Sequence, residues 1–199
     1  MDSNSDVDPA APVLHHFMLK AIRPDEMIDW YARVVGMQVV HRSPVGALLT
    51  NDGTSHRLGL LSSKHFSDDG ERTGHGGMHH VAFTYQTVDD LLGTCERIDR
   101  DHGYRPHAVL DHGMSLSFYF LDPDGNSVEL AVNTLGDDAT AREFMTSSPQ
   151  FAADPLGTFC DGDALIEAWR AGADLDELHR RAYAGEFPPA TEPDLRADL

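Results

Sequence analysis

Residues 13–134 present the same order of elements twice, and this repeat constrains the fold more than any other feature of the sequence. Each half opens with a short apolar run of strand character, continues with an amphipathic helix, and ends with three short strand-like segments. The first half covers residues 13–62 and the second covers residues 77–134, with a polar, glycine-rich linker between them. We therefore predict an α+β fold built from paired βαβββ modules.

Helix starts and stops mark the second element of each half. Pro24, followed by two acidic residues, suits a first helical turn, and Gly36 suits the end of that helix. Thr87 is an N-cap residue for the helix of the second half, which ends at Gly103. Strands are expected in the first half at 13–19, 37–42, 46–50 and 56–61, and in the second at 78–85, 105–110, 115–121 and 128–132.

The segments outside the repeat are acidic. We expect residues 1–12 to form a flexible N-terminus and residues 135–199 to form an acidic, partly helical C-terminal extension. The role of this extension stays open among three alternatives, in which it folds the face carrying Trp169 over a cavity mouth, dimerises, or packs on the outside. Within it we expect a loop at 135–160, helices at 163–171 and 174–184, and a mobile end at 186–199.

Charge and cysteine content exclude several classes of partner. The 199 residues include 15 Lys+Arg and 33 Asp+Glu, a formal net charge of −18. Such a surface repels nucleic acid and anionic lipid, and the sequence holds no apolar run of the roughly 18 residues that a membrane span needs. Cys95 and Cys160 are too few for a disulfide framework, and the polar N-terminus is unlike a signal peptide, so we expect a cytoplasmic protein.

The residues that carry chemistry are two histidine pairs and one carboxylate. His15-His16 and His79-His80 open equivalent strands of the repeat, and Glu129 lies within an apolar terminal strand. A buried carboxylate needs a cation or a hydrogen-bond partner. Two imidazoles and one carboxylate form a ligand set typical of non-haem Fe(II) oxygenases, although zinc accepts the same ligands. Strand alternation lets one histidine of each pair point into a shared cavity and does not say which one.

Three stretches resemble a known family. They are His-His-Phe-Met-Leu (15–19), Met-His-His-Val-Ala-Phe (78–83) and Phe-Tyr-Phe-Leu-Asp-Pro-Asp-Gly-Asn-Ser-Val-Glu-Leu (118–130). Together they are similar to the vicinal oxygen chelate superfamily, and within it to type I extradiol dioxygenases of the catechol 2,3- and dihydroxybiphenyl type. The resemblance covers residues 13–134 and implies a half-open barrel around a metal held by His16, His80 and Glu129. His15 and His79 would then face the other way.

The resemblance implies roles for three further residues. His56 matches a histidine that acts as an acid–base group and stabilises bound oxygen, and Tyr119 matches a tyrosine that hydrogen-bonds the substrate hydroxyl. A third pocket histidine is expected in the family. Direct counting back from Tyr119 reaches Leu110, and a local gap brings His112 to that place instead. We therefore expect His56, Tyr119 and His112 to be catalytic.

The expected function is Fe(II)-dependent extradiol cleavage of a catechol-type aromatic ring with O2. A catechol would chelate the metal through both vicinal oxygens, and the metal lowers the pKa of a bound hydroxyl. Mn(II) is an alternative to Fe(II). The expected partners are a small aromatic diol and O2, with no nucleic acid and no membrane, and assembly into a homo-oligomer is left open.

Two other functions compete with this one. The first is another metal-dependent member of the superfamily, an isomerase or a lyase, and glyoxalase-like members use a fourth ligand, a glutamate in the strand that ends the first half. Residues 57–61 hold no carboxylate there, which favours three ligands with open positions. The second is a metal-free, drug-sequestering binding protein, which has no use for His16, His80 and Glu129 together.

Overall fold

The computed structural model describes residues 12–196, and nearly all of the expected flexible N-terminus (1–12) lies outside these described residues. The chain divides into two compact units, residues 1–67 and residues 68–199. Each contains one module of the repeat, and the C-terminal extension belongs to the second unit. Within residues 12–196, no helix is long and apolar enough to cross a membrane.

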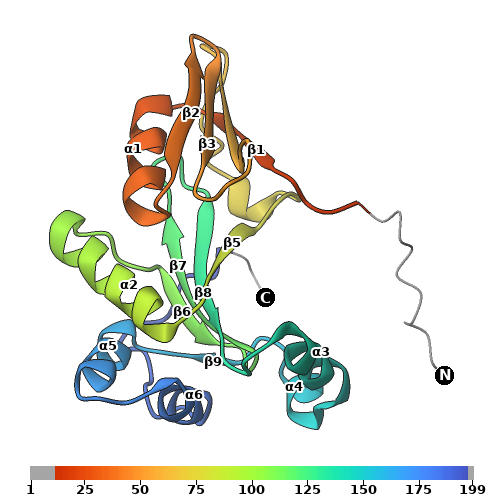
Figure 1. Cartoon of the computed structure of the whole chain (residues 1–199), viewed down its shortest axis with the longest axis vertical. Coiled ribbons are helices and arrows are strands. Elements are labelled where there is room, and N and C mark those ends of the chain that lie inside the picture. The colour runs from red at the N-terminus through yellow and green to blue at the C-terminus, as the bar shows by residue number, and fades with distance from the viewer. Residues whose placement is uncertain (1–11, 197–199) are drawn as a thin grey trace. The chain divides into compact units, whose positions relative to one another are not determined.

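The first unit is one βαβββ module (Figure 1). Its sheet has the strand order β1-β4-β3-β2, in which β1 and β4 are parallel and the other neighbours are antiparallel. Helix α1 packs on this sheet through an apolar face that includes Met27 and Tyr31, both fully buried. The elements are β1 (Phe17–Ala21), α1 (Pro24–Val34), β2 (Gln38–Ser43), β3 (Gly46–Thr50) and β4 (Leu58–Ser62).

The second unit begins with the second βαβββ module, so the predicted repeat is confirmed. Its sheet has the order β5-β8-β7-β6-β9, with β5 and β8 parallel and the other pairs antiparallel. Thr87 caps α2 by accepting a hydrogen bond from Asp90, and Gly103 ends it in the left-handed conformation, φ 68°. The elements are η1 (Arg72–Gly74), β5 (His80–Tyr85), α2 (Val88–His102), β6 (Ala108–Asp111), β7 (Ser115–Leu121) and β8 (Ser127–Asn133).

The two faces of the second sheet differ in chemistry because side chains alternate along each strand. One face is apolar and carries Val109 and Phe118, which lie near Cys95 of α2. The opposite face carries Tyr119 and Glu129, which are direct partners in the β7–β8 register. We call the second face the site face. Strand pairing therefore brings polar groups that are distant in sequence onto one surface.

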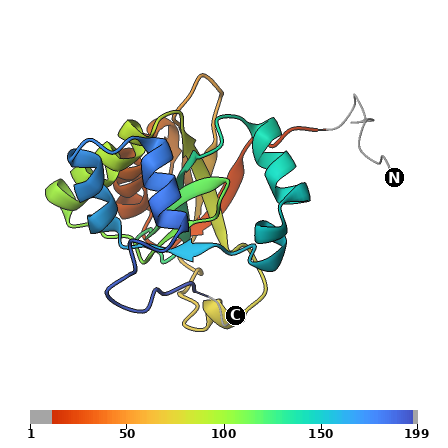
Figure 2. The ribbon, with the colours of Figure 1, turned by 90° about the horizontal axis from the view of Figure 1, so that it is seen from below.

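The extension adds four helices and a strand to the second unit. The expectation of a loop at 135–160 is wrong, because α3 (Asp138–Ser147), α4 (Pro149–Ala153) and β9 (Thr158–Phe159) form there. The side chain of Asp137 caps α3, and Ala141 is the one residue of α3 that is buried, so the helix has no apolar stripe to reveal it. The expected helices are present as α5 (Gly162–Arg170) and α6 (Leu175–Tyr183). Figures 1 and 2 show α3 and α4 on one side of β9, with α5 and α6 on the other.

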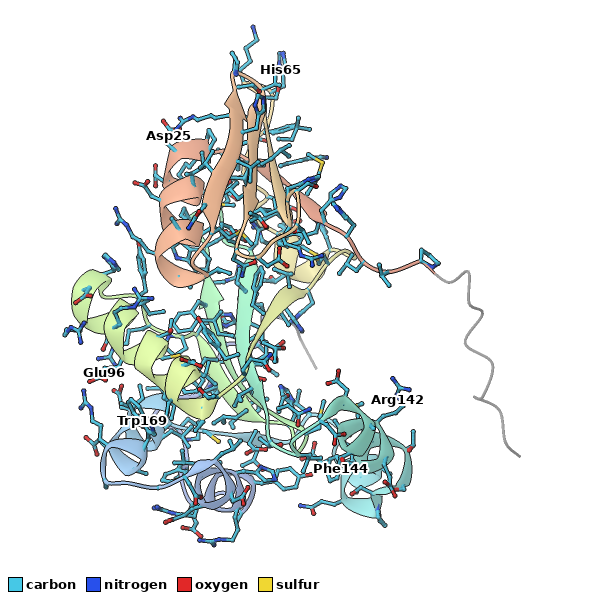
Figure 3. All side chains as sticks on the ribbon, in the orientation of Figure 1. Asp25, His65, Glu96, Arg142, Phe144 and Trp169 are labelled. Atoms are coloured by element: carbon cyan, nitrogen blue, oxygen red, sulfur yellow. The ribbon has the colours of Figure 1, made fainter. Side chains whose placement is uncertain are left out.

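Trp169 packs against α2 and not over a cavity mouth. Its indole Nε1 donates a hydrogen bond to Asp89 Oδ1 at 2.7 Å, and neighbouring Arg170 pairs with Glu96 of the same helix (Figure 3). The described part of the segment 186–199, whose mobility stays a prediction, packs against the second unit. Phe187 is 5% exposed, and backbone atoms of the last described residues bond to the site face, as described below. Residues 197–199 of that expectation lie outside the described part of the chain.

Candidate functional site

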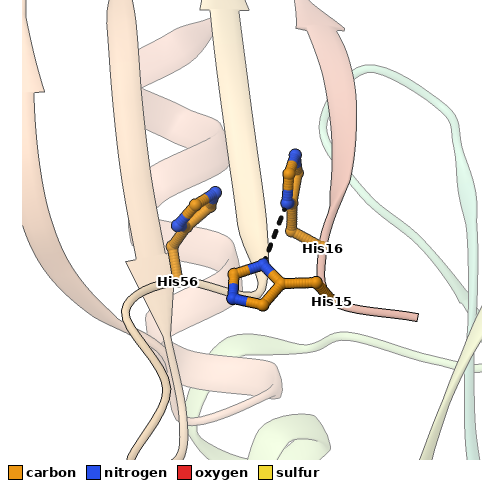
Figure 4. Close-up of side chains that lie close together, drawn as sticks. All are labelled: His15, His16 and His56. Atoms are coloured by element: carbon orange, nitrogen blue, oxygen red, sulfur yellow. Dashed lines mark hydrogen bonds between the residues drawn. The ribbon is translucent and has the colours of Figure 1, made fainter. Parts of the chain in front are cut away.

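The first unit carries a cluster of three histidines, His15, His16 and His56 (Figure 4). One ring nitrogen from each lies within 4.8 Å of the others, and the two Nδ1 atoms of the pair are 3.0 Å apart. The β1–β4 pairing sets this arrangement, since Phe17 donates its N–H to the carbonyl of Arg57 at 3.0 Å. Both pair residues therefore lie just before β1, and His56 lies just before β4.

The prediction that His15 faces away from its neighbour is wrong. Alternation applies only within a strand, and β1 begins at Phe17, so the backbone before it is free to turn both rings to the same side. Partial burial lowers the pKa of His56 below its usual 6.5, and the nearby rings of His16 and His15 lower it further. His56 is thus neutral at physiological pH, the form that binds a metal or accepts a proton.

On the site face of the second unit, His80 and Glu129 form the shortest link between predicted ligands. His80 Nε2 lies 3.0 Å from Glu129 Oε2. The other carboxylate oxygen, Oε1, accepts a hydrogen bond from Ser117 Oγ at 2.6 Å. Glu129 is 7% exposed. Burial on its own would raise the pKa of Glu129, but His80 and Ser117 outweigh it and lower that pKa, so the carboxylate stays ionised.

Tyr119 and His112 continue this polar network. Burial raises the pKa of Tyr119, and the charge of Glu129 and a hydrogen bond to it raise that pKa further, so the phenol keeps its proton and acts as a donor. The Tyr119 hydroxyl lies 2.9 Å from His112 Nε2, and His112 Nδ1 lies 2.6 Å from the carbonyl oxygen of Leu156. Because a carbonyl oxygen only accepts, Nδ1 carries the proton and, in neutral His112, the bare Nε2 faces the phenol.

A second chain of hydrogen bonds fixes the proton on His80. His79 Nε2 lies 2.8 Å from the carbonyl oxygen of Leu195, so this nitrogen is the donor. In neutral His79 the Nδ1 atom is then an acceptor, and it lies 2.8 Å from Nδ1 of His80. His80 therefore carries its proton on Nδ1. The prediction that His79 faces away is wrong, because β5 begins only at His80.

The placement of the His80 proton on Nδ1 suits a cation between His80 Nε2 and Glu129. With the proton of a neutral His80 on Nδ1, its bare Nε2 and the ionised oxygen of Glu129 face each other at 3.0 Å as two acceptors. Two lone pairs at this distance repel unless a positive charge lies near both, supplied by a metal ion or by a second proton on the imidazole. Imidazole nitrogen and carboxylate oxygen are also a ligand combination that Fe(II) accepts. The donor set therefore fits the metal that the sequence predicts.

The six predicted site residues fall into two groups. His16 and His56 lie together in the first unit. The second unit brings together the other four, His80, Tyr119, His112 and Glu129. This arrangement also places His112, and not the alternative Leu110, beside the Tyr119 hydroxyl.

Sequence reasoning missed three residues that hold the network. Ser117 lies two positions before Tyr119 and so shares its face, a signal that strand alternation offered. His107 is half-buried, and its Nδ1 lies 2.6 Å from the carbonyl oxygen of Asp194. Leu156, whose carbonyl oxygen is bonded to His112, carries no chemical signal in the sequence.

Comparison with known proteins identifies the family. The sequence profile of the Glyoxalase/Bleomycin resistance protein/Dioxygenase superfamily matches residues 13–130. The chain is 33% identical over 180 residues to Biphenyl-2,3-diol 1,2-dioxygenase 2 of Rhodococcus globerulus, covering 90% of this chain and 93% of that protein. It is 30% identical over 136 residues to a lactoylglutathione lyase of Neisseria meningitidis, covering 64% of this chain and 96% of the lyase.

A solved structure shares the fold. The glyoxylase/bleomycin resistance protein/dioxygenase domain from Frankia sp. EAN1pec superposes with a TM-score of 0.52 at 15% sequence identity, covering 62% of this chain and 93% of that domain. Profile, relatives and fold agree with the paired βαβββ modules that the sequence predicts. The chain belongs to the glyoxalase/bleomycin resistance/dioxygenase superfamily, the vicinal oxygen chelate proteins.

Proposed function

We propose that this protein is an Fe(II)-dependent extradiol dioxygenase that cleaves the ring of a catechol-type substrate with O2. The observation that carries the proposal is the buried Glu129 carboxylate, whose Oε2 lies 3.0 Å from His80 Nε2, so that one cation, a metal ion or a proton, joins the two groups. The similarity to a biphenyl-2,3-diol dioxygenase over 90% of the chain supports an aromatic diol as substrate.

His16, His80 and Glu129 would hold the metal. The resemblance of the three ligand motifs to the family supports this set. Bound Fe(II) would supply open coordination positions for the two vicinal oxygens of the diol and for O2. With three protein ligands, such a site retains the positions that bidentate substrate binding requires.

The surrounding residues would handle protons. The Tyr119 phenol, held protonated by its raised pKa, would turn its single proton from Glu129 or His112 to a substrate oxygen. His112, with its proton fixed on Nδ1, offers the bare Nε2 as a proton acceptor beside that phenol. His56, neutral because of its lowered pKa, accepts a proton from the second substrate hydroxyl and returns it to the product.

Metal stoichiometry and turnover test the proposal together. The purified protein is reconstituted anaerobically with Fe(II) or, in parallel, Mn(II), and O2 uptake and the absorbance of a ring-opened product are then measured with a series of catechols. We expect one metal per chain and turnover that depends on it. His16→Ala, His80→Ala and Glu129→Ala should each abolish tight binding and turnover.

Controls separate the ligands from other histidines. The exposed His41 and His102 provide matched histidine-to-alanine variants, one in each unit, and both should keep metal and activity. His56→Ala should keep the metal and lose most of the rate. If His16→Ala retains tight stoichiometric metal while His80→Ala loses it, His16 is not a ligand and the proposed ligand set is wrong.

A second candidate function is a metal-dependent lyase, supported by the similarity to lactoylglutathione lyase. The strand that would carry its fourth ligand, β4, reads Leu-Gly-Leu-Leu-Ser and contains no carboxylate. The same reconstituted protein is therefore assayed with the adduct of methylglyoxal and glutathione. Turnover of this adduct without cleavage of any catechol would favour the lyase. Ligand binding by metal-free protein with no turnover would favour the drug-sequestering alternative.

A further inference from the structure

The C-terminal extension contributes side chains to the site face of the second unit. Ala108, Leu110 and Tyr119 of β6 and β7 form a small buried apolar cluster there. Three side chains of the extension pack against this cluster and remain only partly buried. We call them the apolar wall, and they are Leu156, Phe159 and Leu195.

Backbone hydrogen bonds hold each part of the wall in place. The carbonyl of Leu156 accepts from His112, and the carbonyl of Leu195 accepts from His79. Phe159 is held by β9, where it is the register partner of Leu110. These bonds involve residues next to or within the polar network, so the wall lies beside the groups proposed to act on substrate.

A hydrogen-bonded backbone also anchors the chain just before Leu195. Asp194 donates its N–H to the carbonyl of His107 at 3.3 Å, and its own carbonyl accepts from His107 Nδ1 at 2.6 Å. His107 Nε2 lies 3.0 Å from Ser127 Oγ of β8. The end of the extension is therefore attached to the edge of the sheet by one histidine through both its backbone and its ring.

The chemistry of the wall favours apolar groups. Its three members are hydrocarbon side chains that keep exposed surface, so a ligand bound beside Tyr119 can bury that surface with a gain of about 25 cal/mol per Å². A charged substituent would lose hydration there without a partner in the wall. The net charge of −18 disfavours anionic substituents further.

We propose that Leu156, Phe159 and Leu195 select the ring substituent of the substrate and favour an apolar alkyl or aryl group over a charged one. This inference rests on the proposed function. The similarity to the R. globerulus dioxygenase supports it, because a match of 180 residues must extend past residue 134 into the extension, whereas the superfamily profile ends at residue 130. Leu156 and Phe159 thus lie in a part of the chain that is shared with a diol dioxygenase but not required by the superfamily.

The test compares substituted catechols on the same protein sample. The ratio of kcat/KM for 3-phenylcatechol to that for catechol is measured for the wild type, Leu195→Ala and Phe159→Ala, all loaded with Fe(II). We expect each variant to lower this ratio about tenfold, because truncation removes contact with the phenyl group and not with the diol. Leu195→Lys should raise kcat/KM for 3,4-dihydroxyphenylacetate relative to catechol by about the same factor.

Met145→Ala is the matched control, since Met145 belongs to the extension but is 40% exposed outside the wall. It should leave the ratio unchanged. A ratio between two substrates cancels any loss of folded or metal-loaded protein. The Kd of each substituted catechol, relative to the Kd of catechol, is also measured anaerobically by calorimetry, which needs no turnover.

The outcomes separate this inference from the proposed function. If the wild type cleaves no catechol but the ratio of the Kd for 3-phenylcatechol to that for catechol rises about tenfold in the variants, the dioxygenase proposal fails and the wall remains a ligand-binding surface. If Leu195→Ala, Phe159→Ala and Leu195→Lys all leave the kcat/KM and Kd of the substituted catechols, relative to catechol, within twofold of wild type, the wall does not contact the substituent. The inference is then overturned.

Discussion

Removing the ring of His79 should weaken metal binding without touching a metal ligand. His79 connects the carbonyl of Leu195 to Nδ1 of His80 and thereby holds the proton of His80 away from Glu129. In His79→Phe this acceptor is lost. His80 can then move its proton to Nε2 and donate directly to the Glu129 carboxylate, 3.0 Å away. A metal would have to displace that hydrogen bond before it could bind.

The size of the effect follows from the exposure of His79. Loss of a group that orients a metal ligand lowers metal affinity by 10–100-fold in well-buried sites. His79 is exposed, so water can replace part of its contact with His80, and we expect the lower end of that range. A tenfold increase in the Fe(II) Kd corresponds to about 1.4 kcal/mol. At saturating metal the kcat should change much less, since the ligands themselves remain.

Anaerobic titration of Fe(II) against a chelator of known affinity measures this change. His79→Asn provides the conservative variant, because its amide offers both an acceptor for His80 and a donor, and it should recover part of the affinity. His75→Phe is the control, since His75 is an exposed histidine of the same unit that contacts Asp69 and not the network. An Fe(II) Kd within twofold of wild type for His79→Phe would refute the proton arrangement.

Three further predictions concern stability and reactivity. Burial raises the pKa of Cys160 to about 12, so at pH 8 about one thiol in 10⁴ is ionised, and a thiol reagent should label it far more slowly in native protein than in urea. Burial lowers the pKa of His107 below 6.5, so its contribution to stability is full above that pH and is lost as pH falls. His107→Gln should therefore flatten the decline in unfolding free energy between pH 7 and 5, as measured by urea titration, and an unchanged slope would contradict this assignment. Gly157→Ala should lower the free energy of unfolding by about 1–3 kcal/mol, because φ of Gly157 is +85° and the added Cβ would lie 2.2 Å from the carbonyl oxygen of Asp111. A thermal unfolding midpoint equal to that of the wild type would disprove the strain.

Much of the fold could be predicted from the sequence because its signals are local. The strands at 46–50 and 115–121 have the predicted bounds, and Thr87 and Gly103 delimit α2 as expected. Strand, cap and turn preferences depend on neighbouring residues, and the sequence repeats them in the same order in both halves. Helix α3 escaped prediction because its stabilisation is a single side-chain cap and one buried alanine, which leave no periodic pattern.

The candidate site was harder to predict where it depends on backbone carbonyls. His80, Glu129 and Tyr119 carry reactive side chains in patterned strands, and alternation places them on one face. The partners that set their proton positions are the carbonyls of Leu156 and Leu195, and any residue type offers such a group. His15 and His79 were assigned to the wrong side because they precede their strands, His15 by two residues and His79 by one, where alternation has not yet begun.

The proposed metal ligands and the groups that surround them come from different parts of the chain. The superfamily profile ends at residue 130, one position after Glu129, so all three proposed ligands lie inside the part that dioxygenases and lyases of this superfamily share. The groups that orient His80 through His79, fix the proton of His112 and form the apolar wall all come from residues 156–195. A ligand set common to different reactions does not decide among them, since the metal activates any substrate with two suitably placed oxygens. The choice of substrate must then come from what surrounds the metal, and in the second unit the extension supplies much of that surrounding.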